Sequence, residues 1–141
     1  MIAFLDSSAV LKLYLRDEPG REAVRQAATG EVRTAMSRLT HVEVRSGLAA
    51  ARRSGRLAAG AHELAVTAFE ASTSEYYLIE FDEDLALRAG DLAEGFGLRA
   101  GDAIQLASAL TLREDTLFVA WDARLRAASA ASGLAVFPQT I

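Results

Sequence analysis

The sequence contains no cysteine. This absence excludes a disulfide framework, a zinc–thiolate site and a thiol nucleophile, and it fits a reducing cytoplasm, which is the localisation we expect. No apolar run approaches the length of a membrane span. The first apolar stretch is short, lacks a basic flank and contains Asp6, so it does not have the pattern of a signal peptide. We therefore expect no membrane partner.

Lysine is almost absent as well, because Lys12 is the single lysine among 15 basic residues. The net charge of −4 argues against a protein that holds nucleic acid through an overall positive potential. A small site with local arginines is still compatible with it, since the guanidinium group suits bidentate contacts with phosphate. The densest basic cluster, formed by Arg45, Arg52, Arg53 and Arg56, is better explained as a solvated helix end than as an RNA track.

The chain has 141 residues, of which 51% are hydrophobic and 24% are charged. This composition is ordinary for a compact protein, and the length suffices for a sizeable core. No linker, internal repeat or low-complexity tract interrupts it. We therefore expect a single domain over residues 1–141.

Strand and helix patterns alternate along the whole chain. Apolar or β-branched runs predict strands at 2–5, 31–36, 76–81, 117–120 and 134–137. Helical patterns follow each of the first four runs and are expected near 7–14, 19–29, 39–53, 57–72, 82–95, 102–110 and 122–132. In the third of these helices, Leu39, Val42 and Ser46 mark the expected apolar face. The alternation predicts an α/β three-layer sandwich, with a mostly parallel central sheet and helices on both faces.

Three aspartates, Asp6, Asp102 and Asp122, each stand where a helix is expected to begin. Each has an ordinary interpretation as an N-cap, a role worth about 1 kcal/mol. The carboxyl ends of parallel strands and the helices that follow them share one edge of a sheet, so the topology draws Asp6 and Asp122 together. Asp102 does not directly follow a strand, and its approach to the other two is a further inference.

Glu43 lies inside an expected helix, so capping does not explain it, and from its spacing alone a solvated helix glutamate is the favoured interpretation. His41 falls on nearly the opposite helix face, and we therefore reject a metal site built from His41 and His62. If the four carboxylates converge, their mutual repulsion raises their pKa values or requires a cation. Oxygen ligands of this kind select Mg²⁺, with Mn²⁺ as the alternative, and such an ion assists phosphodiester hydrolysis.

Four segments of the chain, taken together and in order, resemble the PIN-domain family, and most of all its VapC branch, the toxins of type II toxin–antitoxin (VapBC) systems. These segments are residues 5–14, 39–44, 101–109 and 118–125. The resemblance implies a PIN-like fold and a Mg²⁺-dependent endoribonuclease that hydrolyses RNA. It also implies a homodimer and a cognate VapB-like antitoxin as partners.

By motif position, the resemblance assigns Asp6, Glu43 and Asp102 to an acidic metal-binding core and Asp122 to the fourth acid. Asp6 and Asp102 are expected to hold the ion most directly. Ser8 matches a small polar position that supports the site.

Two positions depart from the family pattern. Gln105 stands where many relatives have histidine, and Ala120 stands where many have threonine or serine. Neither departure removes a carboxylate.

Two other functions fit an aspartate at the end of a first strand. A phosphatase of the haloacid-dehalogenase type needs a second aspartate two residues later, but Ser8 occupies that position. A receiver-like phosphotransfer module needs a lysine at a late strand end, and the only lysine is Lys12. A catalytically silent PIN scaffold that only binds a partner is the third alternative. The apolar helix faces around Leu48 and Leu64 fit a dimer or antitoxin surface, and plain core packing explains them equally well.

Overall fold

The computed structural model describes residues 1–140 and contains one five-stranded sheet, ordered β3-β2-β1-β4-β5, in which every pairing is parallel. The strands are β1 (Ile2–Leu5), β2 (Arg33–Ser37), β3 (Tyr77–Ile79), β4 (Thr116–Val119) and β5 (Ala135–Phe137). All five expected strands are present. The second begins two residues later than expected, and the third is three residues shorter than expected.

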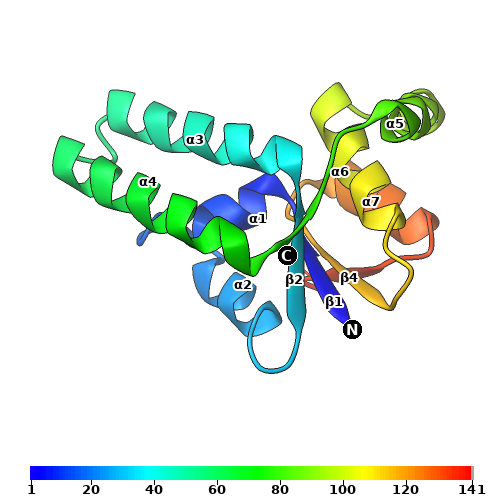
Figure 1. Ribbon diagram of the computed structural model, residues 1–141, viewed down its shortest axis with the longest axis horizontal. Helices are drawn as coiled ribbons and strands as arrows, with labels where there is room; N and C mark the ends of the chain where they lie inside the picture. The colour runs from blue at the N-terminus through cyan, green and yellow to red at the C-terminus, as the bar shows by residue number, and fades with distance from the viewer. Residues whose placement is uncertain (141) are drawn as a thin grey trace.

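The helices cover both faces of this sheet. They are α1 (Ser7–Lys12), α2 (Arg21–Ala27), α3 (Arg38–Arg53), α4 (Ala59–Ser72), α5 (Glu83–Phe96), α6 (Ala100–Leu110) and α7 (Ala123–Ala131), with a short 3-10 turn η1 (Thr73–Glu75) before β3. Figure 1 shows α1–α4 on one side of the sheet and α5–α7 on the other. The expected three-layer α/β sandwich is confirmed.

Two hydrophobic cores separate the three layers, and β1 contributes to both. Ala3 and Leu5 pack with α1–α4, whereas Ile2 and Phe4 pack with α5–α7. Side chains alternate between the two faces of a strand, so a strand covered on both faces has to be apolar throughout. This is why the uncharged opening run becomes the central strand. Phe4 stacks on Phe118 of β4, with 5.5 Å between the ring centroids.

The chain changes face beside β1. The connection from β1 to β2 runs through α1 and α2 on one face, whereas the connections through α5–α6 and α7 use the other face. The strands β1 and β4 are neighbours, and the helices that follow them leave toward opposite layers. In open α/β sheets such a switch point leaves a crevice at the carboxyl ends of the two strands. The fold therefore places a candidate site where Asp6 and Asp122 follow β1 and β4.

Three local expectations were wrong. The sixth helix begins at Ala100, so Asp102 lies inside its first turn and the N-cap position belongs to Arg99, whose backbone is extended. The second helix begins at Arg21 because Gly20 adopts a left-handed conformation with φ 89°. The buried face of α3 is formed by Thr40, Val44, Leu48 and Ala51.

That face is shifted by one to two positions from the expected one, and Val42 is exposed. Helical spacing alone does not tell which of two neighbouring faces meets the sheet. Within residues 1–140, no helix is both long and apolar enough to cross a membrane.

Candidate active site

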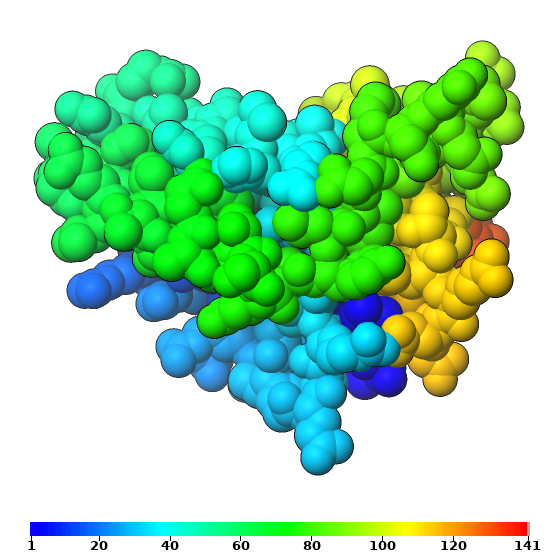
Figure 2. Space-filling model, in the orientation of Figure 1, coloured from blue at the N-terminus to red at the C-terminus, as the bar shows by residue number. Residues whose placement is uncertain are grey.

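A polar pocket of about 470 Å³ opens at the carboxyl edge of the sheet. Its walls come from the ends of β1 and β4, from the first turn of α1 and from the first two turns of α3 and α6. The residues that line it are Asp6, Ser7, Ser8, Glu43, Arg99, Asp102, Gln105, Trp121 and Asp122. All four carboxylates singled out in the sequence therefore lie along one pocket. The space-filling outline is indented between α3 and the α5–α6 side (Figure 2).

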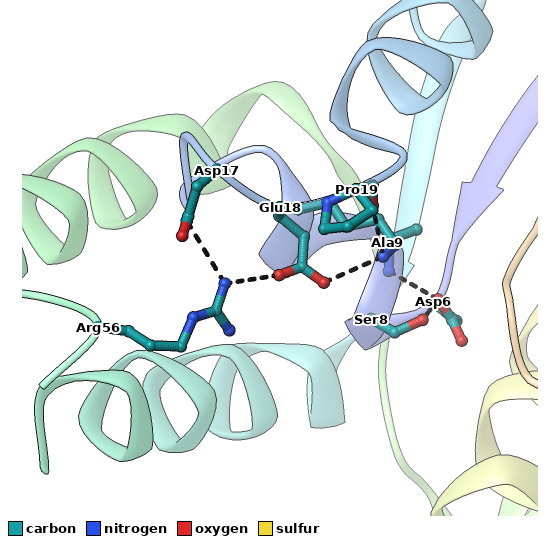
Figure 3. A network of polar contacts seen from close by, with 8 residues as sticks. Asp6, Ser8, Ala9, Asp17, Glu18, Pro19 and Arg56 are labelled. Carbon is teal, nitrogen blue, oxygen red and sulfur yellow. Dashed lines mark hydrogen bonds and ion pairs between the residues drawn. The ribbon is translucent and has the colours of Figure 1, made fainter. Parts of the chain in front are cut away.

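Asp6 both caps α1 and lines the pocket. Its Oδ1 atom accepts a hydrogen bond from the backbone N–H of Ala9 at 2.9 Å and another from the Ser8 hydroxyl at 2.8 Å (Figure 3). Only 5% of Asp6 is exposed. The first turn of α1 thus fixes the orientation of a nearly buried carboxyl group that forms part of the pocket wall.

Glu43 reaches the pocket from the second turn of α3 and is held by neighbours from two other helices. Its Oε1 atom accepts hydrogen bonds from the Ser7 hydroxyl at 2.8 Å and from the Gln105 amide at 3.1 Å. The same amide nitrogen lies 3.0 Å from the Thr40 hydroxyl. Glu43 is therefore a positioned side chain and not an ordinary solvated helix glutamate.

Asp102 and Asp122 face a common cation, Arg99. The guanidinium of Arg99 lies 3.3 Å from Oδ2 of Asp102 and 3.8 Å from Oδ2 of Asp122. Asp122 also caps α7 through a 2.9 Å hydrogen bond from the Leu125 backbone N–H. The Arg99 side chain is 78% exposed, so these ion pairs are screened by solvent and weak, worth about 0–1 kcal/mol.

Gly101, in the first turn of α6, faces Glu43 and Leu39 of α3. A Cβ atom at this position would lie 3.4 Å from Oε2 of Glu43 and 4.0 Å from Cδ2 of Leu39, which is ordinary contact distance. The first turn of α6 is therefore packed against α3, and this packing brings Asp102 toward a site that it does not reach directly from a strand.

Burial and mutual repulsion perturb two of the carboxyl groups. Desolvation raises the pKa of Asp6 to about 6, the hydrogen bonds from Ala9 and Ser8 oppose the rise, and the charges of Asp102 and Glu43 add to it. Desolvation also raises the pKa of Asp102, against the effect of Arg99 and with smaller contributions from Asp122 and Glu43. A desolvated carboxylate with acidic neighbours gains stability from a bound cation.

The donor set fits a hard divalent ion, because every acidic side chain in the pocket offers carboxylate oxygen and no sulfur is available. Over residues 1–140, however, no three acidic or histidine side chains are already gathered as a complete ligand set. The contacts explain this arrangement. Glu43 is drawn toward Ser7 and Gln105, while Asp102 and Asp122 are drawn toward Arg99.

The remaining candidate residues point elsewhere. The His41 ring lies 2.6 Å from Glu70 of α4, which also pairs with Arg45. Arg56 at the end of the basic cluster pairs with Asp17 and Glu18. Leu48 is fully buried, so it is core, whereas Leu64 is 74% exposed beside an apolar hollow.

Sequence reasoning missed several residues of the pocket wall, namely Ser7, Arg99 and Trp121. Ser7 neighbours Asp6, Arg99 precedes Asp102 by one helical turn, and Trp121 precedes Asp122. Proximity in sequence to a candidate acid was the available signal. Gln105, noted only as a departure from a family pattern, is the buried link between Ser7, Thr40 and Glu43.

Comparison with known proteins identifies this architecture. The family model described as "PIN domain" matches residues 3–130. The chain belongs to the PIN-domain family. Ribonuclease VapC45 of Mycobacterium tuberculosis is 35% identical over 138 residues, which cover 97% of this chain and 95% of the relative. This likeness places the PIN domain in the VapC branch.

Solved structures share the fold at lower identity. A toxin–antitoxin complex from Klebsiella pneumoniae matches with a TM-score of 0.59 and 24% identity, over 82% of this chain and 83% of that chain. Mycobacterium tuberculosis VapC20, a toxin that cleaves the sarcin–ricin loop, matches with a TM-score of 0.67 and 18% identity, over 94% of this chain and 95% of that chain. The expected PIN-like fold is therefore confirmed.

Proposed function

We propose that this PIN domain is a Mg²⁺-dependent endoribonuclease that acts as the toxin of a toxin–antitoxin pair. The observation that carries the proposal is the single pocket at the switch point between β1 and β4, lined by Asp6, Glu43, Asp102 and Asp122. The relative that is named a ribonuclease supports RNA as the substrate. The domain is proposed to comprise residues 1–141 and to act in the cytoplasm.

Asp6 and Asp102 would hold the divalent ion most directly, with Glu43 and Asp122 completing the acidic site. Mg²⁺ bound there, or Mn²⁺ in its place, would supply positive charge to the phosphate that is attacked. The residues behind these ligands define their geometry. Ser8 and the Ala9 N–H orient Asp6, and Ser7 and Gln105 orient Glu43.

Arg99 has to give up Asp102 and Asp122 when an ion takes its place. Its side chain is exposed and its ion pairs are weak, so this exchange requires little free energy. Arg99 lies at the boundary between the carboxylate pocket and a second hollow of about 500 Å³ that Arg124 also lines. Both guanidinium groups are placed to meet RNA phosphates next to the carboxylates.

The structure does not favour the phosphotransfer alternative. Lys12, the only lysine, donates to Glu18 and to the Pro19 carbonyl and is not among the residues that line the carboxylate pocket. It is therefore unsuited to the role of the late-strand lysine in a receiver domain. The silent-scaffold alternative differs from our proposal only in activity, so a cleavage assay separates the two.

The partner we propose is a VapB-like antitoxin, with a second copy of the chain completing a homodimer. The solved toxin–antitoxin complex supports such a partner. The apolar hollow of about 710 Å³ between α4 and the turn that follows α1, where Leu64 is exposed, offers a surface for it.

The test is RNA cleavage by purified protein with Mg²⁺ and after EDTA. We expect cleavage only with the divalent ion. Asp102→Asn should lower the rate at least about 100-fold, because even residues behind metal ligands contribute about 10- to 100-fold. Asp91→Asn, an exposed acid on α5, is the matched control and should keep full activity. Equal cleavage by wild type and Asp102→Asn would refute the proposed site. If the wild type does not cleave RNA, the proposal is refuted in favour of the catalytically silent scaffold.

A further inference from the structure

The only tryptophan of the chain, Trp121, lines the carboxylate pocket, one residue before Asp122. It lies in the turn between β4 and α7 and is half-buried. Val119 and Trp121 both pack with the layer formed by α1–α4, whereas Ala120 between them packs with the opposite layer. This alternation directs the indole toward the ends of α1 and α2, next to the acidic site.

The indole is fixed by contacts that leave it little freedom. Gly20 approaches it so closely that a Cβ atom there would lie 2.9 Å from Cζ2 of Trp121. The Lys12 ammonium lies 4.8 Å from the ring centroid, within the range of a cation–π contact. The aromatic ring is therefore braced from the side of α1 and α2.

Lys12 is buried, with only 8% of the residue exposed, and its ammonium group has fixed partners. Its Nζ atom donates to Glu18 Oε1 at 3.1 Å and to the Pro19 carbonyl at 2.9 Å. Arg56 then binds Glu18 at 2.8 Å and Asp17 at 3.4 Å (Figure 3). Lysine is almost never buried without partners. Here the ion pairs from Arg56 to Glu18 and from Glu18 to Lys12 hold the buried ammonium group against the indole of Trp121.

We propose that Trp121 is a stacking platform for an RNA base next to the phosphate at the carboxylate site, and that Lys12 and Gly20 are the residues that position it. Single-stranded RNA is commonly held by bases that stack on aromatic side chains. Such stacking accepts every base and contributes about 5- to 150-fold in affinity per base. The proposal rests on the nuclease function above, because it places the base beside the phosphate to be cleaved.

The positions of Trp121, Arg99 and Arg124 around the carboxylates predict the path of the RNA strand across the site. With a phosphate at Asp6 and Asp102, a flanking base meets Trp121 on the α1 side. The backbone passes Arg99 and Arg124, which line the adjoining hollow. Trp121 packs with the α1–α4 layer, whereas Arg99 and Arg124 come from the N-terminal ends of α6 and α7.

The first experiment uses Trp121 as its own reporter. In the Asp102→Asn protein, which we expect to cleave RNA at least about 100-fold more slowly, a short single-stranded RNA of mixed sequence is titrated in EDTA while tryptophan emission is followed. We expect quenching by the RNA and none by an abasic oligonucleotide of the same length, since no other tryptophan is present. Binding by RNA without any change in emission would overturn the proposal.

The second experiment compares cleavage by wild type, Trp121→Phe and Trp121→Leu. We expect Trp121→Leu to raise KM about 5- to 150-fold with a smaller effect on kcat, and Trp121→Phe to keep KM within a few-fold of wild type. An unchanged KM in Trp121→Leu, with wild-type cleavage intact, would overturn the platform while the nuclease stands. If Trp121→Leu does not fold, the emission titration decides by itself.

Lys12 has its own readout as a positioning residue. Lys12→Met removes the ammonium but leaves Glu18 paired with Arg56. We expect a shift in Trp121 emission and a higher KM in Lys12→Met, with recovery of both in Lys12→Arg, whose cation also stacks on aromatic rings. A change in thermal stability alone, with emission and KM unchanged, would reduce Lys12 to a purely structural residue and refute its positioning role.

Discussion

Asp6 has two functions in the structure, and the sequence could suggest both but not combine them. An aspartate between a strand and a helix predicts an N-cap, and Asp6 is one. The same carboxyl group is nearly buried in a pocket with three other acids. Its capping bonds use Oδ1, so the cap orients the group that we propose as a metal ligand.

The pKa of Asp6 makes a prediction about stability without metal. In the unfolded chain this carboxyl titrates near 3.8, and in the folded protein near 6. Below pH 3.8 both states hold the proton. Between pH 3.8 and 6 the folded state alone retains it, so rising pH destabilises the fold. Above pH 6 Asp6 is ionised in both states, and its burial lowers the free energy of unfolding by at most about 3 kcal/mol.

Asp6→Asn removes that cost and keeps a good N-cap residue. At pH 7.5 in EDTA we expect the variant to unfold at a higher denaturant concentration than wild type. Its free energy of unfolding should be larger by about 1–3 kcal/mol. The difference should shrink as the pH falls toward 4. Asp91→Asn, which changes the net charge equally at an exposed position, should show neither effect. A stabilisation of Asp6→Asn that persists unchanged at pH 4 would contradict the proposed cause.

Other residues of the pocket were beyond sequence reasoning for a physical reason. The role of Arg99 depends on its reaching both Asp102 and Asp122, which are 20 positions apart in the chain. The role of Gln105 depends on three oxygen atoms from α1 and α3. Periodicity predicts the face on which a residue lies, but not the partners that other elements bring to it.

Among the secondary-structure elements, the crossing of α1 and α3 matters most for the site. Ser7 on α1 donates to Glu43 on α3, so the distance between the two helices sets the position of a proposed ligand. Gly47 allows this distance, because a Cβ atom there would lie 2.7 Å from Cδ2 of Leu11.

Two helix glycines test this crossing. Alanine in place of glycine inside a helix stabilises by about 0.5–1 kcal/mol where space permits. Gly90→Ala on α5 meets open space and should show that gain in a denaturant titration. Gly47→Ala has to displace the Leu11 side chain, and overpacking costs about 1–3 kcal/mol. We expect it to be neutral or destabilising.

RNA cleavage by the two glycine variants separates packing from the site. Gly90→Ala should cleave as wild type does, whereas Gly47→Ala should lose activity as Ser7 and Glu43 move apart. If both variants are stabilised equally and remain fully active, the α1–α3 distance does not control the site.

Element boundaries show where sequence patterns lose information. The start of α6 was expected at Asp102, because an aspartate after a glycine-containing break has the composition of a cap. The helix begins at Ala100, after the extended N-cap residue Arg99, and its first turn lies against α3 at Gly101. The strands, in contrast, were located well. A central parallel strand must be apolar on both faces, and that requirement is visible in the residues themselves.

At the scale of the whole molecule, alternation of strands and helices was enough to predict the layers. The strand order was not predicted from the pattern, although it creates the pocket by placing β4 beside β1. Long-range pairing of this kind depends on which helix layer each connection chooses. The family resemblance supplied the information that composition and periodicity lacked.

A bound divalent ion should stabilise the entire fold, since the four carboxylates come together only in the folded state. At a free Mg²⁺ concentration 100 times the dissociation constant, the gain is about 2.7 kcal/mol. For a protein of this size it corresponds to roughly 5–15 °C in Tm. Differential scanning calorimetry with MgCl₂, and with NaCl at equal ionic strength, measures it.

Asp102→Asn is the control for this stabilisation, and its Tm should respond far less to Mg²⁺. A wild-type Tm that rises equally in MgCl₂ and in NaCl would show general screening of charge and no site.

The pairing of β1 with β4 also has a consequence for protein synthesis. Asp6 is synthesised long before β4, one of the two strands beside β1, which comprises residues 116–119, and before Asp122, the last of the four pocket acids. A nascent chain that stops after β3 contains Asp6 and Glu43 but neither Asp102 nor β4. The pocket therefore forms only after residues 116–122 have been translated. Products of translation interrupted before β4 lack the complete site, so the order of the strands delays any toxicity until β4 and Asp122 have been made.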